Sequence, residues 1–242
     1  MTRKLIFFCF LLYAIRSTGD SPVNGEILCN RVEGRIIVDG NIDEPAWRKA
    51  VPISFVKIVS LDKPVSTTMA YCLYDDRCIY FAFACNDRDI WATLKNRDSQ
   101  LWDQDVVEIF LKPDFFDDSF YEFQVSPRNI VLDAFILRRF REKMFWRFTE
   151  WNCAGFKSAT RINGTLNNWL DEDNSWKIEI SIPFKALLSD GRVPARNDVW
   201  LVNFGRYDYS VYLENGFEVS TSCAIKKFDF HRYEEWSRLK FN

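Results

Sequence analysis

The chain has 242 residues, enough for one large β domain or two small ones, and 17% are aromatic, which suits a large core. Its formal net charge of −2 at pH 7 argues against a nucleic-acid partner, which would require a basic face. A basic start at Arg3 and Lys4, followed by the apolar run 5–15, predicts a secretory signal peptide over residues 1–19. We therefore expect a secreted or periplasmic protein, and no later apolar run is long enough for a membrane span.

Six cysteines follow the predicted signal peptide. An even number of cysteines in an exported protein predicts disulfide bonds, although the sequence does not choose among the possible pairings. No C-x-x-C pair occurs and the chain has one His, so the sequence argues against a zinc site. The six cysteines are Cys29, Cys72, Cys78, Cys85, Cys153 and Cys223.

Alternating apolar and polar residues, with turn residues between them, predict a succession of short strands. In chain order, the expected strands are 67–74, 78–85, 106–111, 120–125, 129–136, 155–161, 176–182, 200–207 and 237–241. The turns of the first two hairpins are expected at Asp75-Asp76 and at Pro113-Asp114. Short helical turns are expected at 43–47 and 182–187.

Many short strands with few helices indicate an all-β fold, namely an antiparallel β-sandwich of the jelly-roll type with one or two short helical turns. No linker rich in Pro, Gly or Ser and no internal repeat divides the chain. We expect a tether over residues 20–30 and a single domain over residues 31–242.

Trp102 stands at the start of the most informative segment, ahead of a run of acids and a strand with Glu108 at its centre. An acid inside an otherwise apolar strand is costly unless it is paired or faces a site. A flat indole beside carboxylates also suits a sugar, because sugar C–H faces lie on aromatic rings and sugar hydroxyls donate to acids. The alternative is that Trp102 packs in the core next to a solvated turn.

Several segments, in this order, resemble carbohydrate-binding module family 9, within the wider DOMON-like group of β-sandwiches. The segments are 37–47, 75–87, 102–111, 176–183, 200–206 and 230–241. The resemblance spans nearly all of the mature chain. It implies a β-sandwich in which a sugar end is held between two aromatic side chains, aided by acids and amides.

The resemblance also implies which residues bind the sugar. Trp102 matches the first aromatic and Glu108 an acidic ligand, while Phe230 stands where a well-studied branch of the family has Trp. Phe offers less stacking area than Trp and no N–H donor. Gln124, which lies where that branch has Arg, and His231 are the other expected hydrogen-bond partners.

The expected function is therefore non-catalytic binding of a polysaccharide or oligosaccharide, in support of carbohydrate catabolism. Proteins of this kind are often secreted beside glycoside hydrolases or fused to them, so a hydrolase is a candidate partner. A hydrolytic domain is the alternative, since hydrolysis requires two carboxylates about 5–10 Å apart. No spacing selects such a pair among the acids, which include Asp103, Asp105, Glu108, Glu122 and Asp133.

Two further alternatives concern cofactors. Asp87, Asp103 and Asp105 are candidate calcium ligands in loops that can converge, and the protein would then be a calcium-stabilised structural or adhesive module. The other reading of these residues is a solvated acidic loop. Some DOMON-like sandwiches bind haem, but the mature chain offers only His231, Met69 and Met144 as axial ligands, which argues against that role.

Overall fold

Thirteen strands form one curled sheet in the computed structural model, which describes residues 25–34, 36–139, 148–188 and 190–242. The strands are β1 (Glu26–Arg31), β2 (Ile53–Ser54), β3 (Val56–Lys57), β4 (Thr68–Tyr74), β5 (Cys78–Asn86), β6 (Val106–Lys112), β7 (Phe120–Val125), β8 (Val131–Ile136), β9 (Lys157–Asn163), β10 (Ser175–Pro183), β11 (Val199–Tyr209), β12 (Phe217–Thr221) and β13 (Ser237–Phe241). The helical segments are η1 (Pro45–Lys49), η2 (Leu101–Asp103), α1 (Phe184–Leu187) and η4 (Tyr233–Glu235).

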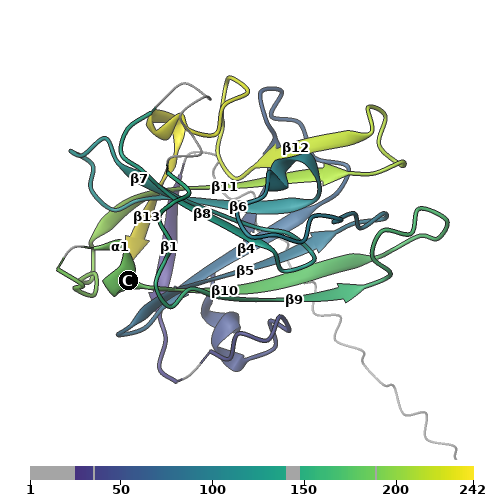
Figure 1. Ribbon diagram of the computed structural model, residues 1–242. Coiled ribbons are helices and arrows are strands. Elements are labelled where there is room, and N and C mark those ends of the chain that lie inside the picture. Colours follow the sequence, from purple (N-terminus) through teal and green to yellow (C-terminus); the bar gives the residue numbers. More distant parts are fainter. Residues whose placement is uncertain (1–24, 35, 140–147, 189) are drawn as a thin grey trace, which may run out of the picture.

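The strand order along the sheet is β8-β7-β6-β11-β13-β1-β4-β5-β10-β9. In addition, β12 pairs with β11 and β3, and β2 pairs with β4. Most pairs are antiparallel, whereas β1 runs parallel to both of its neighbours. In Figure 1 the sheet folds over into two layers, with β6, β7, β8 and β11 above β4, β5, β9 and β10. The expected antiparallel β-sandwich with short helical turns is thus confirmed.

The main hydrophobic core lies between the two layers. The ring of Phe204 on β11 contacts Phe81 and Phe83 on β5, with centroids 5.5 and 5.6 Å apart. Strand alternation explains this core, because every second residue of β6, such as Val107 and Ile109, points into it. The residues between them therefore face away from the core.

The outer face of the β6–β7–β8–β11 layer is buried as well. Phe110 and Phe120 on this face form a second hydrophobic cluster with Phe230 and Trp236, which come from the chain before and after η4. Polar side chains on the outer face, Glu108 among them, are therefore enclosed although they point away from the main core. The candidate site lies on this face, beneath the segment that covers it.

Residues 26–30 belong to β1 and are not a tether, which corrects the expected domain boundary. β1 joins the two layers, because it pairs with β13 at Cys29↔Phe241 and with β4 at Asn30↔Leu73. Both partner strands are distant in sequence, so no local pattern marks these residues as a strand. The predicted signal peptide and residues 20–24 lie outside the described residues.

All six cysteines after residue 19 are free thiols, so the expected disulfide bonds are not found. Five of the six are buried, and Cys78 is half-buried. Cys29, Cys72, Cys85 and Cys153 pack in the main core, where each acts as a small apolar side chain.

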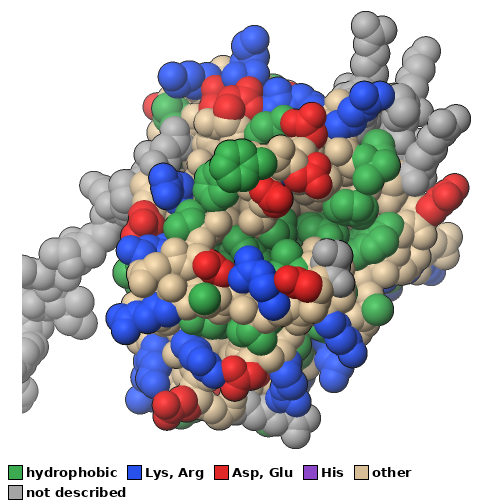
Figure 2. Space-filling view, turned by 90° about the vertical axis from the view of Figure 1, so that its left-hand side faces the viewer, with side chains coloured by type: hydrophobic (Ala, Val, Ile, Leu, Met, Phe, Trp, Pro, Cys, Tyr) green, Lys and Arg blue, Asp and Glu red, His purple; other side chains and the backbone are tan. Residues whose placement is uncertain are grey.

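The surface in Figure 2 carries acidic and basic side chains intermixed around a central hydrophobic area. Within the described part of the chain, no helix has the length and apolar character needed to cross a membrane.

Candidate functional site

Glu108, Gln124 and Gly205 form one row across three strands on the outer face of the sheet. Glu108 on β6 lies directly opposite Gln124 on β7 and Gly205 on β11. Because Gly205 has no side chain, other groups lie close over it. A Cβ at this position would come within 3.0 Å of both Glu108 Oε2 and Phe230 Cζ. Glu108 and the ring of Phe230 are therefore neighbours above the Gly205 backbone.

The polar groups around this row form a buried cluster. Gln124 Nε2 donates a hydrogen bond to Glu122 Oε1 at 2.7 Å, and His231 Nε2 lies 2.9 Å from Glu122 Oε2. Glu108 Oε2 and Gln124 Oε1 have no hydrogen-bond partner among the described residues, although both atoms are buried. Leaving buried polar atoms unpaired costs about 1–3 kcal/mol each, so they are expected to be satisfied by a ligand or by water.

The charge state of the cluster follows from its burial. Burial raises the pKa of Glu108 well above its usual value, and the nearby Glu122 carboxylate raises it further. A neutral Glu108 can both donate and accept a hydrogen bond. For His231, burial lowers the pKa and the hydrogen bond to Glu122 raises it, and the net shift is upward. Both shifts favour the protonated forms of Glu108 and His231.

The aromatic ring of Phe230 borders this polar cluster. The ring of Phe230, which is 7% exposed, lies 5.6 Å from Phe110 and 5.8 Å from Tyr207, centroid to centroid. Trp102 in η2 is half-buried and packs against the second hydrophobic cluster, so it does not belong to the main core. Its carbonyl accepts a hydrogen bond from the hydroxyl of Tyr209 at 3.0 Å.

Of the five sugar-binding residues predicted from the sequence, the structure brings Glu108, Gln124, Phe230 and His231 together. Trp102 packs against the second hydrophobic cluster on the same face of the sheet. Sequence reasoning missed Gly205 and Tyr207, which share the outer face of β11. The sequence analysis named Glu122 only as one of several acids considered for hydrolysis. The alternation Gly205-x-Tyr207-x-Tyr209 indicates that these three residues share one face of a strand. The sequence does not reveal the strand register that sets this face beside Glu108.

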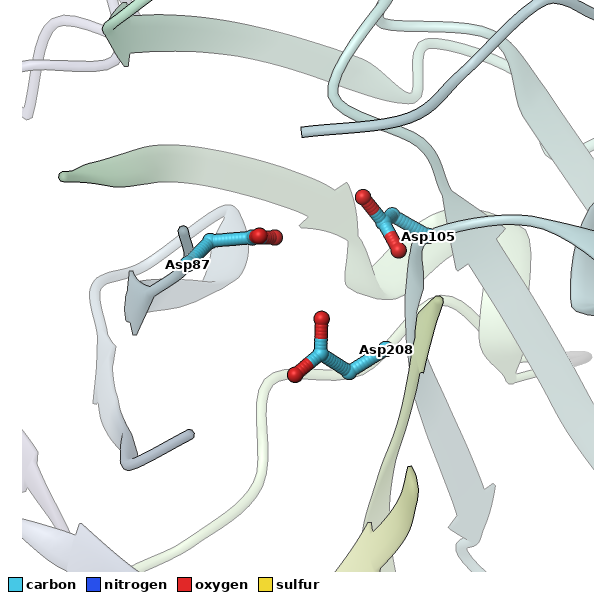
Figure 3. Close-up of side chains that lie close together, drawn as sticks. All are labelled: Asp87, Asp105 and Asp208. Carbon is cyan, nitrogen blue, oxygen red and sulfur yellow. The ribbon is translucent and has the colours of Figure 1, made fainter. Parts of the chain in front are cut away.

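The predicted metal ligands do not all meet. Asp87 and Asp105 converge with Asp208 at one end of the sandwich, each offering an oxygen within 4.8 Å of the others (Figure 3). Asp103 is absent from this cluster. It lies exposed in η2, where it accepts a hydrogen bond from Gln100 at 2.8 Å. Asp208, from β11, takes the place that the sequence analysis gave to Asp103.

A buried guanidinium already neutralises part of this acidic cluster. Arg206 contacts Asp87 at 3.0 Å and Asp208 at 3.3 Å. Asp105 instead accepts backbone hydrogen bonds from Trp91 at 2.6 Å and Tyr209 at 2.7 Å. A calcium ion among these oxygens would compete with Arg206 for the carboxylates of Asp87 and Asp208.

The acidic cluster predicts a pH-dependent stability. Burial raises the pKa of Asp87 to about 6, against opposition from Arg206, whereas an unfolded Asp titrates near about 4. The folded state thus binds more protons between these values, so the contribution of Asp87 is fully present below about pH 4 and is lost as the pH rises through about 6. Urea unfolding from pH 4 to 7.5 should show this decline in the free energy of unfolding.

The matched variants for this measurement are Asp87→Asn and, as a control at an exposed acid, Asp43→Asn. Asp87→Asn should flatten the decline, because the amide does not titrate, whereas Asp43→Asn should keep the wild-type profile. An unchanged profile in Asp87→Asn would refute the assignment.

Comparison with known proteins gives the same fold and a family. Residues 38–210 match the model of the family described as "Carbohydrate family 9 binding domain-like". Among curated proteins, none matches the sequence significantly. A crystal structure of a putative carbohydrate-binding protein from Bacteroides uniformis is similar, with a TM-score of 0.64 at 14% sequence identity, over 90% of this chain and 99% of that chain.

A family 9 carbohydrate-binding module from Caldicellulosiruptor kristjanssonii is similar as well, in its complexes with cellotriose and with glucose. Both give a TM-score of 0.60 at 16% identity and cover 90% of this chain. The match covers 93% of the cellotriose-bound chain and 95% of the glucose-bound chain. At this identity the structures establish the fold, and the family match extends over most of the described sandwich. This chain therefore belongs to the carbohydrate family 9 binding domain-like family.

Proposed function

We propose that this protein binds carbohydrate without chemistry of its own, at the outer-face cluster of Glu108, Gln124, Phe230, His231 and Trp102. The observation that carries the proposal is the pair of buried, unpaired oxygens, Glu108 Oε2 and Gln124 Oε1, beside an aromatic ring. Membership of the family supports it. Glucose and cellotriose, which bind the C. kristjanssonii module, are the first ligands to test.

Each group has a role in this proposal. A neutral Glu108 exchanges hydrogen bonds with a sugar hydroxyl as donor and acceptor, and Gln124 Oε1 accepts from another. The hydrogen bonds from Gln124 and His231 hold the Glu122 carboxylate in place. The faces of Phe230 and Trp102 take the apolar side of the sugar ring. Each hydrogen bond nets about 0.5–1.5 kcal/mol, so the affinity should be modest.

The pairing of Glu122 favours binding over hydrolysis. A hydrolase needs one carboxylic acid and one carboxylate free to attack or to activate water. Glu108 can serve as the acid, but both oxygens of Glu122 are engaged, one by Gln124 and one by His231. We propose that the protein acts after export, as the pattern of residues 1–19 predicts. A glycoside hydrolase acting on the bound polysaccharide is the proposed partner.

Calorimetric titration of the purified protein with glucose and with cellotriose tests the proposal. Wild type should bind, and Glu108→Ala should weaken binding about tenfold or more, because a buried ligand group is lost. Glu33→Ala, at an exposed acid outside the cluster, is the matched control and should bind as wild type does. Equal affinity in Glu108→Ala and wild type would refute the site. A wild type that binds neither sugar, nor any glycan on an array, would refute the function.

A further inference from the structure

We infer that the sugar site continues as an aromatic groove along β11, formed by Tyr207, Tyr209 and Phe217 with Trp102 beside it, and that this groove takes the further residues of a glycan chain. The inference rests on the proposed function and extends it from one sugar ring to a chain. It concerns three rings that the sequence analysis did not assign to the site.

Strand geometry places these rings in one line. Tyr207 and Tyr209 alternate with buried residues on β11, so they share the outer face with Gly205. Tyr209 lies directly opposite Phe217 of β12. Their rings stack, with centroids 5.6 Å apart and planes at 23°. The rings thus lead from Phe230, which touches Tyr207, to the Tyr209–Phe217 pair at the end of both strands.

The degree of exposure rises along this line. Phe230 is nearly buried, Tyr207 and Tyr209 are half-buried, and Phe217 is 43% exposed. An exposed aromatic ring at the end of two strands is not required by the core. The orientation of Tyr209 is also fixed, because its hydroxyl donates to the Trp102 carbonyl. The groove therefore consists of rings held in place before any ligand binds.

A polar rim accompanies the rings. Asp103 is exposed in η2, and Gln100 holds its carboxylate. Asp103 directly follows Trp102, whose carbonyl accepts the hydrogen bond of the Tyr209 hydroxyl, so the acid lies near the Tyr209 end of this line. A carboxylate beside aromatic faces offers acceptors for hydroxyls and platforms for C–H faces. A sugar chain fits this combination of a carboxylate and aromatic rings better than an apolar partner does. An apolar partner would offer Asp103 no hydrogen-bond donor.

We expect a glycan chain in the groove because the groove adjoins the proposed sugar site. A chain whose end sits at Glu108 and Phe230 has Tyr207 as its next aromatic neighbour, and the Tyr209–Phe217 pair after that. In the other direction β6 and β11 continue toward Lys112 and Leu201, where the β6–β7 connection carries the fully exposed Phe116. Phe116 therefore provides a control at an exposed ring far from the groove.

Titration with glucose, cellobiose and cellotriose tests the groove through the gain in affinity with chain length. In wild type, cellotriose should bind about three- to tenfold more tightly than glucose, as expected for one added stacking contact. Phe217→Ala should reduce this gain to less than about twofold, and so should Phe217→Leu, which keeps apolar volume without a flat ring. Phe116→Ala should keep the wild-type gain.

The outcomes separate the groove from the proposed function. If wild type binds glucose and cellotriose equally well, or if Phe217→Ala keeps the full gain, the groove is refuted and the sugar site stands. If wild type binds none of the three sugars or any other glycan, the proposed function fails and the groove fails with it. Thermal unfolding of Phe217→Ala close to wild type, as expected at this exposed end of β12, shows that the fold is intact.

Discussion

Replacing Arg206 with methionine is expected to lower the free energy of unfolding by about 3–5 kcal/mol. The Arg206 side chain is fully buried and pairs with Asp87 and Asp208. Its guanidinium also donates to Thr68 Oγ1 at 3.0 Å and to the Asn86 carbonyl at 2.9 Å. Methionine fills much of the same volume but leaves the carboxylates without a buried counter-charge. Breaking one side of a buried ion pair is costly because the other side stays desolvated and unpaired.

Urea unfolding at pH 7.5 measures this loss. Arg192→Met removes a surface ion pair with Asp198 and is the matched control, expected to cost about 0–1 kcal/mol. Adding Asp208→Asn to Arg206→Met should recover part of the stability, since one uncompensated charge is removed. A loss below about 1 kcal/mol in Arg206→Met would show that the ion-pair network does not hold this end of the sandwich.

Glu179→Ala is expected to cost a similar amount, about 3–5 kcal/mol, by releasing the chain segment around η1. The Glu179 carboxylate on β10 accepts hydrogen bonds from the Asp39 and Gly40 amides at 3.0 and 2.9 Å and from Trp47 Nε1 at 2.7 Å. Gly40 has a φ of 87°, and a Cβ there would lie 2.8 Å from the Thr160 backbone, so this turn depends on glycine. Alanine at 179 would leave three donors without their acceptor.

Two measurements separate local release from global unfolding. Urea unfolding gives the total loss, and hydrogen exchange at the Gly40 amide and the Trp47 indole reports the local opening. Glu179→Gln keeps one acceptor oxygen and the side-chain volume, so its loss should fall between those of wild type and Glu179→Ala. Wild-type protection of the Trp47 indole in Glu179→Ala would contradict this account.

Local sequence patterns sufficed for the hairpins but not for every strand. The alternation in β4–β5 and β6–β7 predicts both strands and turn, because each hairpin pairs neighbours in sequence. β1 lacked such a signal, since its partners β4 and β13 are far along the chain. The sequence analysis did not predict β12 either. Its partner is local, but its sequence Phe217–Thr221 ends in polar residues that resemble a loop.

The candidate site shows the same division. Glu108 stood out because an acid interrupts an apolar strand, and Phe230 came from the resemblance. Tyr207 could be identified as a neighbour of the site only from the β6–β11 register, because it lies two residues after Gly205 on the same face of β11. Arg206 and Asp208 lie in the same strand but point to the opposite face. Two charges within an apolar strand indicate a buried pair, but sequence alone does not name Asp87 as the partner.

The cysteines illustrate a pattern with two physical causes. An even count in an exported chain fits disulfides, and it also fits thiols that pack as small apolar side chains. In the structure the six cysteines after residue 19 are free thiols, and Cys29, Cys72 and Cys85 pack in the main core. Spacing along the sequence does not reveal which face of a strand a cysteine occupies.

The indole resonances of the tryptophans during a glucose titration give the most direct test of the proposed site. The Trp102 signal is identified as the one missing from the spectrum of Trp102→Phe. Trp102 packs against the second hydrophobic cluster, whereas Trp176 and Trp200 are buried in the main core. The account predicts that the Trp102 indole signal shifts on saturation with glucose while the Trp176 and Trp200 signals stay in place. A saturable glucose response that leaves Trp102 unchanged would place the sugar elsewhere and contradict the account.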